Sequence, residues 1–248
     1  MSDPFRIDGL RAMVTGANTG IGQAIAQSLA ERGAHVLAAG RSSTEETVEM
    51  ITAAGGSAEP FALDLADPEA GAARLTEAGE LDILVNNAGI IRRADAVDYA
   101  ASDWWDVLDV NLTSVFLLSQ AFGRAALERG SGGRIVNIAS LLSFQGGIRV
   151  PAYTASKHGV AGLTKALANE WAGAGITVNA IAPGYIATNN TQALRDDPVR
   201  AAEILGRIPA GRWGAPSDIG GAAAFLCTPA AGYVTGAVLN VDGGWLAR

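Results

Sequence analysis

Cysteine and histidine are scarce in this sequence, which has one Cys and two His among 248 residues. A single cysteine cannot form an internal disulfide, and it offers no thiolate cluster for zinc. Neither His35 nor His158 belongs to a carboxylate–histidine cluster with the spacing of a zinc site. We therefore expect no disulfide and no metal site in the chain.

Positive charge is also limited, because 18 basic residues stand against 25 acidic ones and give a net charge of −7. Nucleic-acid binding requires a basic stripe, and the sequence shows none. No apolar run reaches the roughly 18 residues of a membrane span, and residues 1–10 lack the apolar core of a signal peptide. We expect a cytoplasmic protein with no nucleic-acid or membrane partner. Since 49% of its residues are hydrophobic and only 17% are charged, it can bury one large core.

Short apolar runs alternate with amphipathic runs along the chain. Strands are predicted at residues 11–15, 35–39, 58–63, 83–86, 134–139, 176–181 and 237–241. Helices are predicted at residues 21–32, 43–54, 68–78, 102–128, 152–172 and 217–226. This alternation is typical of right-handed βαβ crossovers. We therefore expect an α/β fold, a doubly wound Rossmann-type parallel sheet of about seven strands with helices on both faces.

No linker or internal repeat divides the chain, so residues 1–248 are expected to form a single domain. The longest irregular stretch covers residues 183–213. A structureless loop of that length would be unusual inside a domain, so we expect helical pieces here that act as a lid.

A glycine-rich turn, T-G-A-N-T-G-I-G at residues 15–22, follows the first predicted strand. Glycines allow a tight turn that approaches a pyrophosphate, which then lies at the N-terminus of the next helix. The spacing G-x-x-x-G-x-G differs from the G-x-G-x-x-G fingerprint, so an ordinary strand-to-helix turn is the alternative. Two more signals, Asp64-Leu65 and N-N-A-G at residues 86–89, end later strands, and turn chemistry alone could explain each of them.

Ser140 ends the fifth predicted strand, and Tyr153 and Lys157 stand four residues apart at the start of the next helix. Residues at this spacing share one helical face. A free tyrosine has a pKa of about 10, and a nearby ammonium group favours the phenolate and lowers that pKa. Tyr153 is therefore a candidate acid or base. The alternative is a polar pair on a solvated helix face.

With these motifs, nearly the whole chain resembles the short-chain dehydrogenase/reductase family. The resemblance rests on T-G-x-x-x-G-I-G, N-N-A-G, Y-x-x-x-K and Pro183-Gly184, together with Asp64, Asn111 and Ser140. It implies that Tyr153 is the catalytic acid or base, while Ser140 hydrogen-bonds the substrate oxygen. It also implies that Lys157 holds the nicotinamide ribose and lowers the Tyr153 pKa. Asn111 would anchor a water molecule that continues the proton path.

The same resemblance implies a bound NAD(P)(H). The cofactor-binding residues would be Gly16, Asn18, Thr19, Gly20, Ile21, Arg41, Asp64, Leu65, Asn87, Ala88, Gly89, Tyr153, Lys157, Pro183, Gly184, Ile186 and Thr188. Gly40 offers no carboxylate for the ribose hydroxyls of NAD, whereas Arg41 could pair with a 2′-phosphate or stack on adenine. The related NAD-linked enzymes point the other way, so the choice between NAD and NADP stays open.

Four stretches, at residues 87–93, 143–151, 183–191 and 242–248, resemble one subgroup of the family. These enzymes of uronate breakdown are the 2-deoxy-D-gluconate 3-dehydrogenases, also described as 2-dehydro-3-deoxy-D-gluconate 5-dehydrogenases. The resemblance implies oxidation of a sugar acid at C3 or C5, respectively. The candidate substrate-binding residues are Arg93, Gln145, Arg149, Tyr185 and Asn190.

Several alternatives remain open at this point. Arg93 and Arg149, our candidates for binding a carboxylate, could instead pair with surface acids or a neighbouring subunit. The substrate could be that of a 3-oxoacyl reductase or of an enzyme like gluconate 5-dehydrogenase. The alternative to an enzyme is a non-catalytic module that binds a dinucleotide.

The predicted helix at residues 102–128 carries more apolar surface than one sheet face can cover. Its large apolar residues include Trp104, Trp105, Leu108, Leu112, Val115, Phe116 and Leu118. Such an excess is typical of a subunit interface, and the family resemblance implies two-fold packing of this helix. We therefore expect a homotetramer.

Overall fold

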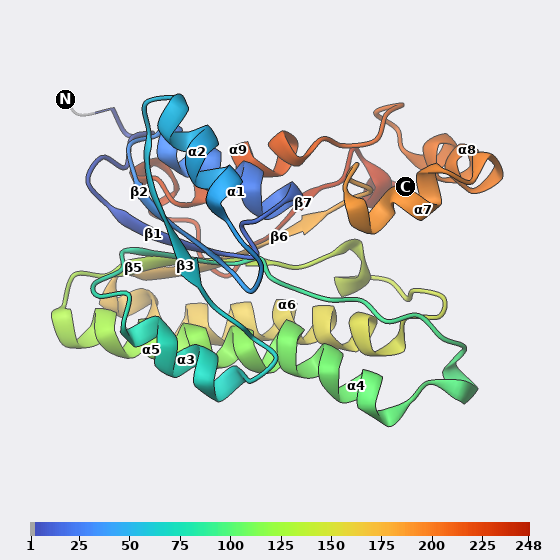
Figure 1. The fold of residues 1–248 in the computed structure, drawn as a ribbon, viewed down its shortest axis with the longest axis horizontal. Coiled ribbons are helices and arrows are strands. Elements are labelled where there is room, and N and C mark those ends of the chain that lie inside the picture. Colours follow the sequence, from blue (N-terminus) through green and yellow to red (C-terminus); the bar gives the residue numbers. More distant parts are fainter. Residues whose placement is uncertain (1–2) are drawn as a thin grey trace.

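Seven parallel strands form one sheet at the centre of the molecule (Figure 1). The computed structural model describes residues 3–248, so the first two residues of the expected 1–248 domain lie outside the described part. The strands are β1 (Arg11–Thr15), β2 (His35–Gly40), β3 (Ser57–Ala62), β4 (Ile83–Asn86), β5 (Gly133–Ile138), β6 (Ile176–Pro183) and β7 (Val238–Val241). Their order in the sheet is β3-β2-β1-β4-β5-β6-β7, which confirms the Rossmann-type topology.

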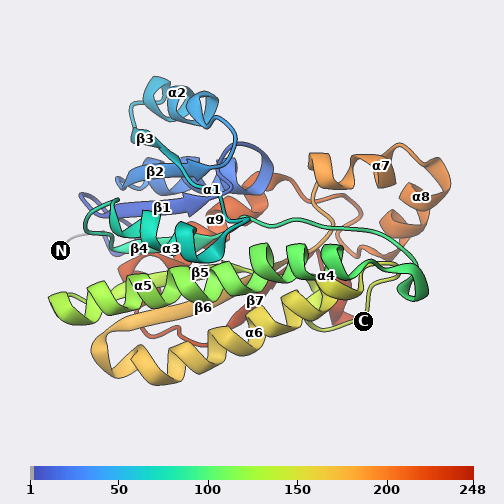
Figure 2. The same cartoon turned by 60° about the horizontal axis from the view of Figure 1, so that its bottom comes forward.

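Helices cover both faces of this sheet (Figures 1 and 2). One face carries α1 (Gly20–Glu31), α2 (Glu45–Ala53) and α9 (Pro216–Leu226). The other face carries α3 (Pro68–Thr76), α4 (Ala101–Leu108), α5 (Ser114–Arg129) and α6 (Pro151–Trp171). None of the helices within residues 3–248 is long and apolar enough to cross a membrane.

Each face of the sheet has its own apolar core. Val14 packs with Ile25 of α1 on one face, while its neighbour Met13 packs with Phe122 of α5 on the other. This division follows from the two-residue period of a strand, which sends successive side chains to opposite faces. Cys227 lies in the first core, where burial raises the pKa of its thiol to about 12. It is therefore a packing residue rather than a nucleophile.

The helix predicted at residues 102–128 is interrupted in the structure. A π-helical turn, Asp109–Thr113, joins α4 to α5. It includes Asn111, whose side chain is fully buried. The Asn111 side chain accepts a hydrogen bond from the Ile90 N–H at 2.8 Å and donates one to the Ile90 carbonyl at 2.9 Å. Single π-helical turns occur frequently at functional sites, and this one ties α4 and α5 to the segment after β4.

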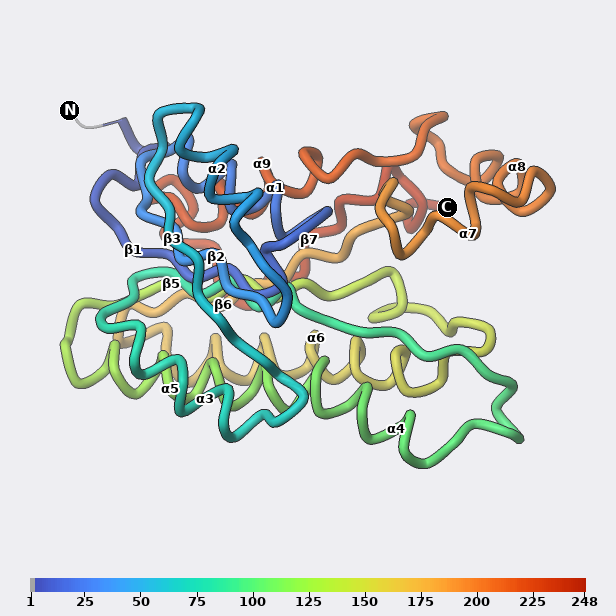
Figure 3. Tube along the Cα trace, in the orientation of Figure 1, coloured from blue at the N-terminus to red at the C-terminus, as the bar shows by residue number. Residues whose placement is uncertain are grey.

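The stretch at residues 183–213 contains the predicted helical pieces, α7 (Gln192–Arg195) and α8 (Pro198–Arg207). They lie beyond the carboxyl ends of the strands, beside the C-terminus of the chain (Figure 3). Helix α8 begins with a proline, and the Asp197 side chain accepts hydrogen bonds from the N–H groups of Val199 and Arg200 at 3.0 and 3.1 Å. At the same edge, the chain leaves β1 for β2 on one side of the sheet and leaves β4 for β5 on the other side. Open α/β sheets bind ligands at the point where the strand order reverses in this way.

Candidate active site

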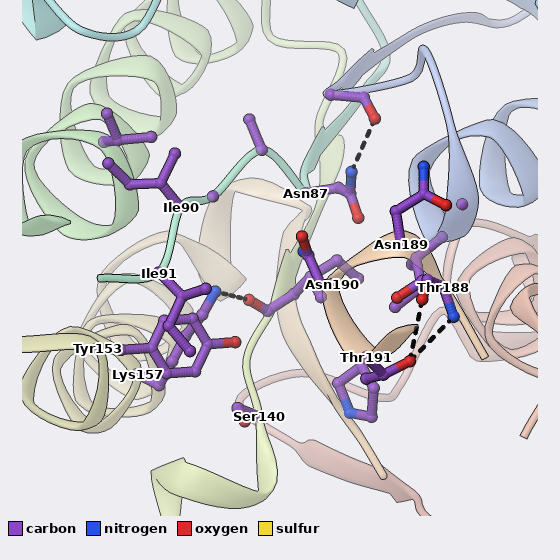
Figure 4. Close-up of a pocket in the computed structure, with 18 of the residues that line it drawn as sticks. Asn87, Ile90, Ile91, Ser140, Tyr153, Lys157, Thr188, Asn189, Asn190 and Thr191 are labelled. Atoms are coloured by element: carbon purple, nitrogen blue, oxygen red, sulfur yellow. Dashed lines mark hydrogen bonds between the residues drawn. The ribbon is translucent and has the colours of Figure 1, made fainter. Parts of the chain in front are cut away.

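A cleft of about 870 Å³ lies along the carboxyl edge of the sheet. It extends from the glycine-rich turn after β1 to the first turn of α6, and the segment after β6 contributes to its wall. Figure 4 shows Tyr153 and Lys157 beside Ser140, with Asn189 and Asn190 on the segment across from them. A cleft of this size is within the usual range for cofactor sites, about 300–1,000 Å³.

Most residues that the sequence singles out line this cleft. They are Gly16, Asn18, Thr19, Gly20, Ile21, Arg41, Asp64, Leu65, Asn87, Ala88, Gly89, Arg93, Ser140, Gln145, Tyr153, Lys157, Pro183, Gly184, Tyr185, Thr188 and Asn190. Asn111, Ile186 and Arg149 do not line it. Asn111 lies behind the wall in the π-helical turn, and Ile186 is buried and bridges to Gly214.

Arg149, a candidate for the substrate carboxylate, does not line the cleft and contacts a different segment. Its side chain forms an ion pair with Asp95, with 3.0 Å between Nε and Oδ1. Its carbonyl accepts a hydrogen bond from the Ala94 N–H at 3.1 Å. Its backbone φ is +64°, a value that few residues other than glycine adopt. Arg149 therefore fastens the loop before α6 to the segment after β4, which takes its guanidinium away from the cleft.

The glycine-rich turn has a shape that side chains would prevent. Gly16 has a φ of +65°, and a Cβ there would lie 3.0 Å from the Cα of Ala88. A Cβ on Gly22 would lie 2.1 Å from the Gly16 carbonyl oxygen. The Asn87 side chain donates to the carbonyl of Thr15 at 2.8 Å, so it holds the turn against the end of β4.

The N-terminus of α1 opens from this turn toward the cleft. Its N-cap residue, Thr19, makes no capping hydrogen bond with its side chain. The first backbone N–H groups of a helix lack intrahelical partners, and together with the helix dipole they favour a phosphate. The turn and helix thus fit the pyrophosphate of a dinucleotide.

The cleft wall beyond the turn is built from the ends of β2 and β3. Arg41 follows β2, is exposed, and has no carboxylate within ion-pair distance among residues 3–248. Asp64 follows β3, and its Oδ1 accepts a hydrogen bond from the Ala66 N–H at 3.0 Å. A guanidinium and a fixed carboxylate therefore line this part of the cleft, where the adenosine half of a dinucleotide would lie.

Lys157 is almost completely buried, with 4% of its surface exposed. Its Nζ donates a hydrogen bond to the Ile138 carbonyl, at the end of β5, at 2.6 Å. Burial lowers the pKa of Lys157 to about 8. The amine also lies 5.5 Å from the centre of the Tyr153 ring, one helical turn away as the spacing predicts.

The pKa of Tyr153 is raised, because burial disfavours the phenolate. The nearby Ser140 hydroxyl and the positive charge of Arg93 oppose this effect without cancelling it. Lys157 is not among the groups that shift this pKa, so its expected lowering of the Tyr153 pKa stays a prediction. At neutral pH the phenol holds its proton, and it can donate that proton to an oxygen in the cleft.

Asn111 contributes to the position of Tyr153 from behind the cleft. Its Nδ2 lies 3.4 Å from the Ser156 hydroxyl, which in turn donates to the Tyr153 carbonyl at 2.8 Å. With its two bonds to Ile90, Asn111 thus connects the segment after β4 to the first turns of α6. These contacts hold the helix turn that carries the phenol and the amine.

The sequence did not point to several other residues of the cleft. They are Leu194, Arg200, Arg207 and Trp245 among others. The closest signal was the D-G-G-W sequence at residues 242–245, whose glycines fit the family resemblance. Nothing in that sequence shows on which side of the sheet the chain ends, because this depends on the path of the chain after β7.

Comparisons with known proteins agree with this geometry. A family model described as enoyl-(acyl carrier protein) reductase matches residues 16–246. The chain is 56% identical, over 100% of its length and 99% of the relative, to 2-dehydro-3-deoxy-D-gluconate 5-dehydrogenase of Bacillus subtilis. It is 53% identical to the enzyme of the same name from Escherichia coli, with 98% of both chains covered.

Solved structures give the same result. One from Agrobacterium tumefaciens, provisionally described as a 2-deoxy-D-gluconate 3-dehydrogenase with bound NADP, is 62% identical with a TM-score of 0.97 and full coverage of both chains. A gluconate 5-dehydrogenase from Burkholderia cenocepacia, in complex with NADP and tartrate, is 39% identical with a TM-score of 0.93. It covers 99% of this chain and 98% of its own.

Proposed function

Because the chain belongs to the short-chain dehydrogenase/reductase family, we propose that it interconverts a secondary alcohol and a ketone on a sugar acid with NADP(H). The observation that carries this proposal is the placement of Ser140, Tyr153 and Lys157 in one cleft with the glycine-rich turn. A non-catalytic dinucleotide-binding module would have no need of a buried amine beside a phenol.

The reaction follows from the groups at the inner end of the cleft. When bound, NADP(H) supplies or accepts the hydride. In the direction of reduction, Tyr153 donates its proton to the carbonyl oxygen of the substrate. The Ser140 oxygen accepts a hydrogen bond from the Leu142 N–H at 3.1 Å, which leaves its own hydrogen for the same substrate oxygen. In the direction of oxidation, the Tyr153 phenolate accepts the proton of the alcohol.

Lys157 and Asn111 support this proton transfer in the proposal. The Lys157 amine would hydrogen-bond the ribose next to the nicotinamide while it keeps its contact with the Ile138 carbonyl. Asn111 would anchor the water molecule that continues the proton path. Its contacts with Ile90 and Ser156 fix its amide for that role.

The residues at the end of β2 support a preference for NADP(H) over NAD(H). Gly40 cannot supply the carboxylate that binds the ribose hydroxyls of NAD, and it leaves the first side chain of this turn to Arg41. The Arg41 guanidinium, free of carboxylate partners within residues 3–248, can pair with a 2′-phosphate. The bound NADP in two similar structures supports this choice.

The proposed substrate is 2-dehydro-3-deoxy-D-gluconate, oxidised at C5, or 2-deoxy-D-gluconate, oxidised at C3. The names of the similar enzymes support both. So does the wall formed after β6, where Tyr185, Asn189 and Asn190 offer polar groups to substrate hydroxyls. A 3-oxoacyl reductase would be expected to have a more apolar wall for its acyl substrate.

We further propose that residues 183–213 act as a lid on a single-domain subunit, and that four cytoplasmic subunits assemble. Three large apolar side chains on α4 and α5 support the assembly: Trp105, Phe116 and Leu127 are 60%, 38% and 46% exposed. Val115 and Leu118 of the same stretch are buried within the subunit.

A substrate panel tests the proposed function. Purified enzyme is assayed at 340 nm with 2-dehydro-3-deoxy-D-gluconate, 2-deoxy-D-gluconate, D-gluconate and a 3-hydroxybutyryl thioester, each with NAD⁺ and NADP⁺. We expect the highest kcat/KM for one of the first two acids with NADP⁺. The highest value for the thioester, or no turnover of any acid, would contradict the proposal.

A further inference from the structure

The C-terminal turn of the chain is built against the end of α8. The Asp242 side chain accepts hydrogen bonds from the N–H groups of Gly244 and Leu246 at 2.8 and 2.9 Å. Gly244 has a φ of +89°, and a Cβ there would lie 3.1 Å from Pro209. The Arg248 guanidinium donates to the Gly206 carbonyl at 2.9 Å. These contacts fix the last residues of the chain beside the cleft.

This turn places Trp245 under the guanidinium of Arg207. Trp245 is 4% exposed, and the Arg207 guanidinium carbon lies 4.0 Å from the centre of a Trp245 ring. Tyr185 supports the indole with 4.8 Å between ring centres, and the Gln145 side chain accepts from the indole N–H at 3.4 Å. An aromatic face attracts a guanidinium and orients its plane, while the N–H groups at the guanidinium edge stay free for a ligand.

Four other cations that line the cleft have a partner within the protein or lie at a different part of the cleft. Arg92 lies near Asp103 and Asp106, at 3.6 and 3.9 Å. Arg200 pairs with Glu203 at 3.0 Å. Lys157 donates to a backbone carbonyl, and Arg41 lies at the end of β2.

Arg93 and Arg207 are the two remaining cations of the cleft, and neither has a carboxylate within 4.0 Å in the described part of the chain. The charge of Arg93 opposes the rise in the Tyr153 pKa, so Arg93 acts on the part of the cleft that holds the phenol. Arg207, the last residue of α8, rests on Trp245 on the side of the cleft that α8 and the C-terminal turn form.

We propose that Arg207, held on the face of Trp245, binds the carboxylate of the substrate and selects hydroxy acids over neutral sugars. This inference rests on the proposed sugar-acid function. A guanidinium edge matches a carboxylate with two parallel N–H···O bonds. Trp245 acts as a positioning residue, because it limits the orientations of the guanidinium without touching the carboxylate.

The test compares a charged substrate with its neutral counterpart. The acid with the highest kcat/KM in the panel above and its primary amide are assayed with wild type and with Arg207→Gln. We expect kcat/KM for the acid to fall about 10- to 150-fold, mainly through KM, with little change for the amide. Lys165→Gln, which removes an exposed cation of α6 outside the cleft, is the matched control and should leave the acid-to-amide ratio unchanged. Trp245→Leu should lower that ratio by a smaller factor.

The ratio separates the proposal from a general loss of structure, which would lower both substrates alike. An unchanged acid-to-amide ratio in Arg207→Gln overturns the proposal while the proposed function stands. A ratio that falls in Arg93→Gln but not in Arg207→Gln overturns it as well and moves the carboxylate to Arg93. If wild type acts on none of the acids, the proposed function and this inference both fail.

Discussion

Replacing Lys157 by Met should make the cofactor-free protein more stable at neutral pH, although it should abolish activity. The ordinary pKa of 10.5 falls to about 8 because the Lys157 amine is buried. At pH 7 the folded protein therefore keeps a desolvated charge, whereas the unfolded chain keeps a hydrated one. Between pH 8 and 10.5 the unfolded chain binds more protons than the folded one, so stability rises with pH across that window.

The magnitude follows from the size of this pKa change. A fall from 10.5 to about 8 corresponds to about 3 kcal/mol of unfavourable free energy at pH 7. The hydrogen bond from Lys157 to the Ile138 carbonyl, lost in the variant, offsets this by about 1 kcal/mol. Methionine is unbranched and slightly shorter than lysine, so Lys157→Met keeps most of the packing. We expect the variant to be more stable than wild type by about 2 kcal/mol at pH 7.

The assay is urea unfolding of both proteins without cofactor, at equal protein concentration, at pH 7 and pH 9.5. The neutral amine still donates to Ile138, so the pH-dependent part of the difference reports the buried charge alone. We expect the advantage of the variant to shrink by about 2 kcal/mol between the two pH values. A constant or growing advantage would refute the reasoning, because it would mean that Lys157 titrates at its ordinary pKa.

Three further predictions concern other groups. Arg41→Ala should weaken NADPH binding about 10- to 150-fold and NADH binding much less, and equal losses in dissociation constant would rule out recognition of the 2′-phosphate. Arg93→Gln should raise the Tyr153 pKa, so the alkaline limb of ketone reduction, which needs the protonated phenol, should move to higher pH, and an unmoved limb would count against the contact. Light scattering should give a tetramer that Trp105→Glu weakens, whereas a wild-type mass near 25.3 kDa would contradict assembly.

Much of the fold is predictable from the sequence because its signals are local. Residues 11–15 and 83–86 form strands with the predicted bounds, since buried parallel strands are short apolar runs that end at turn residues. The carboxyl ends of parallel strands meet at one edge, so Ser140 and Tyr153 could be placed in the same cleft as the glycine-rich turn without coordinates.

The features that sequence reasoning missed depend on geometry beyond one element. The apolar pattern of residues 102–128 continues through the π-helical turn at Asp109–Thr113, so periodicity gives no sign of it. Arg149 has the chemistry of a carboxylate ligand, but a positive φ and its contact with Asp95 take it elsewhere. Arg207 stacks on Trp245 only because the turn after β7 returns to α8.

Whether Gly40→Asp is a useful test of NAD recognition also depends on contacts that the sequence does not show. Gly40→Asp would place the carboxylate used for NAD recognition at the end of the strand, where the sequence suggests it. A Cβ there would lie 3.0 Å from the Thr44 methyl carbon and 3.1 Å from the Ser42 carbonyl oxygen. The variant would therefore disturb the turn, and Arg41→Ala is the cleaner experiment.

The central claim is that Tyr153 transfers the proton in a sugar-acid dehydrogenase reaction. The most direct measurement is kcat for NADP⁺-dependent oxidation of the preferred sugar acid, followed at 340 nm, for wild type and Tyr153→Phe. Tyr233→Phe is the control, because that phenol is fully exposed and does not line the cleft. We predict a loss of about 10²- to 10⁴-fold for Tyr153→Phe with NADPH affinity nearly unchanged. A kcat within about tenfold of wild type would contradict the role of Tyr153 as acid and base.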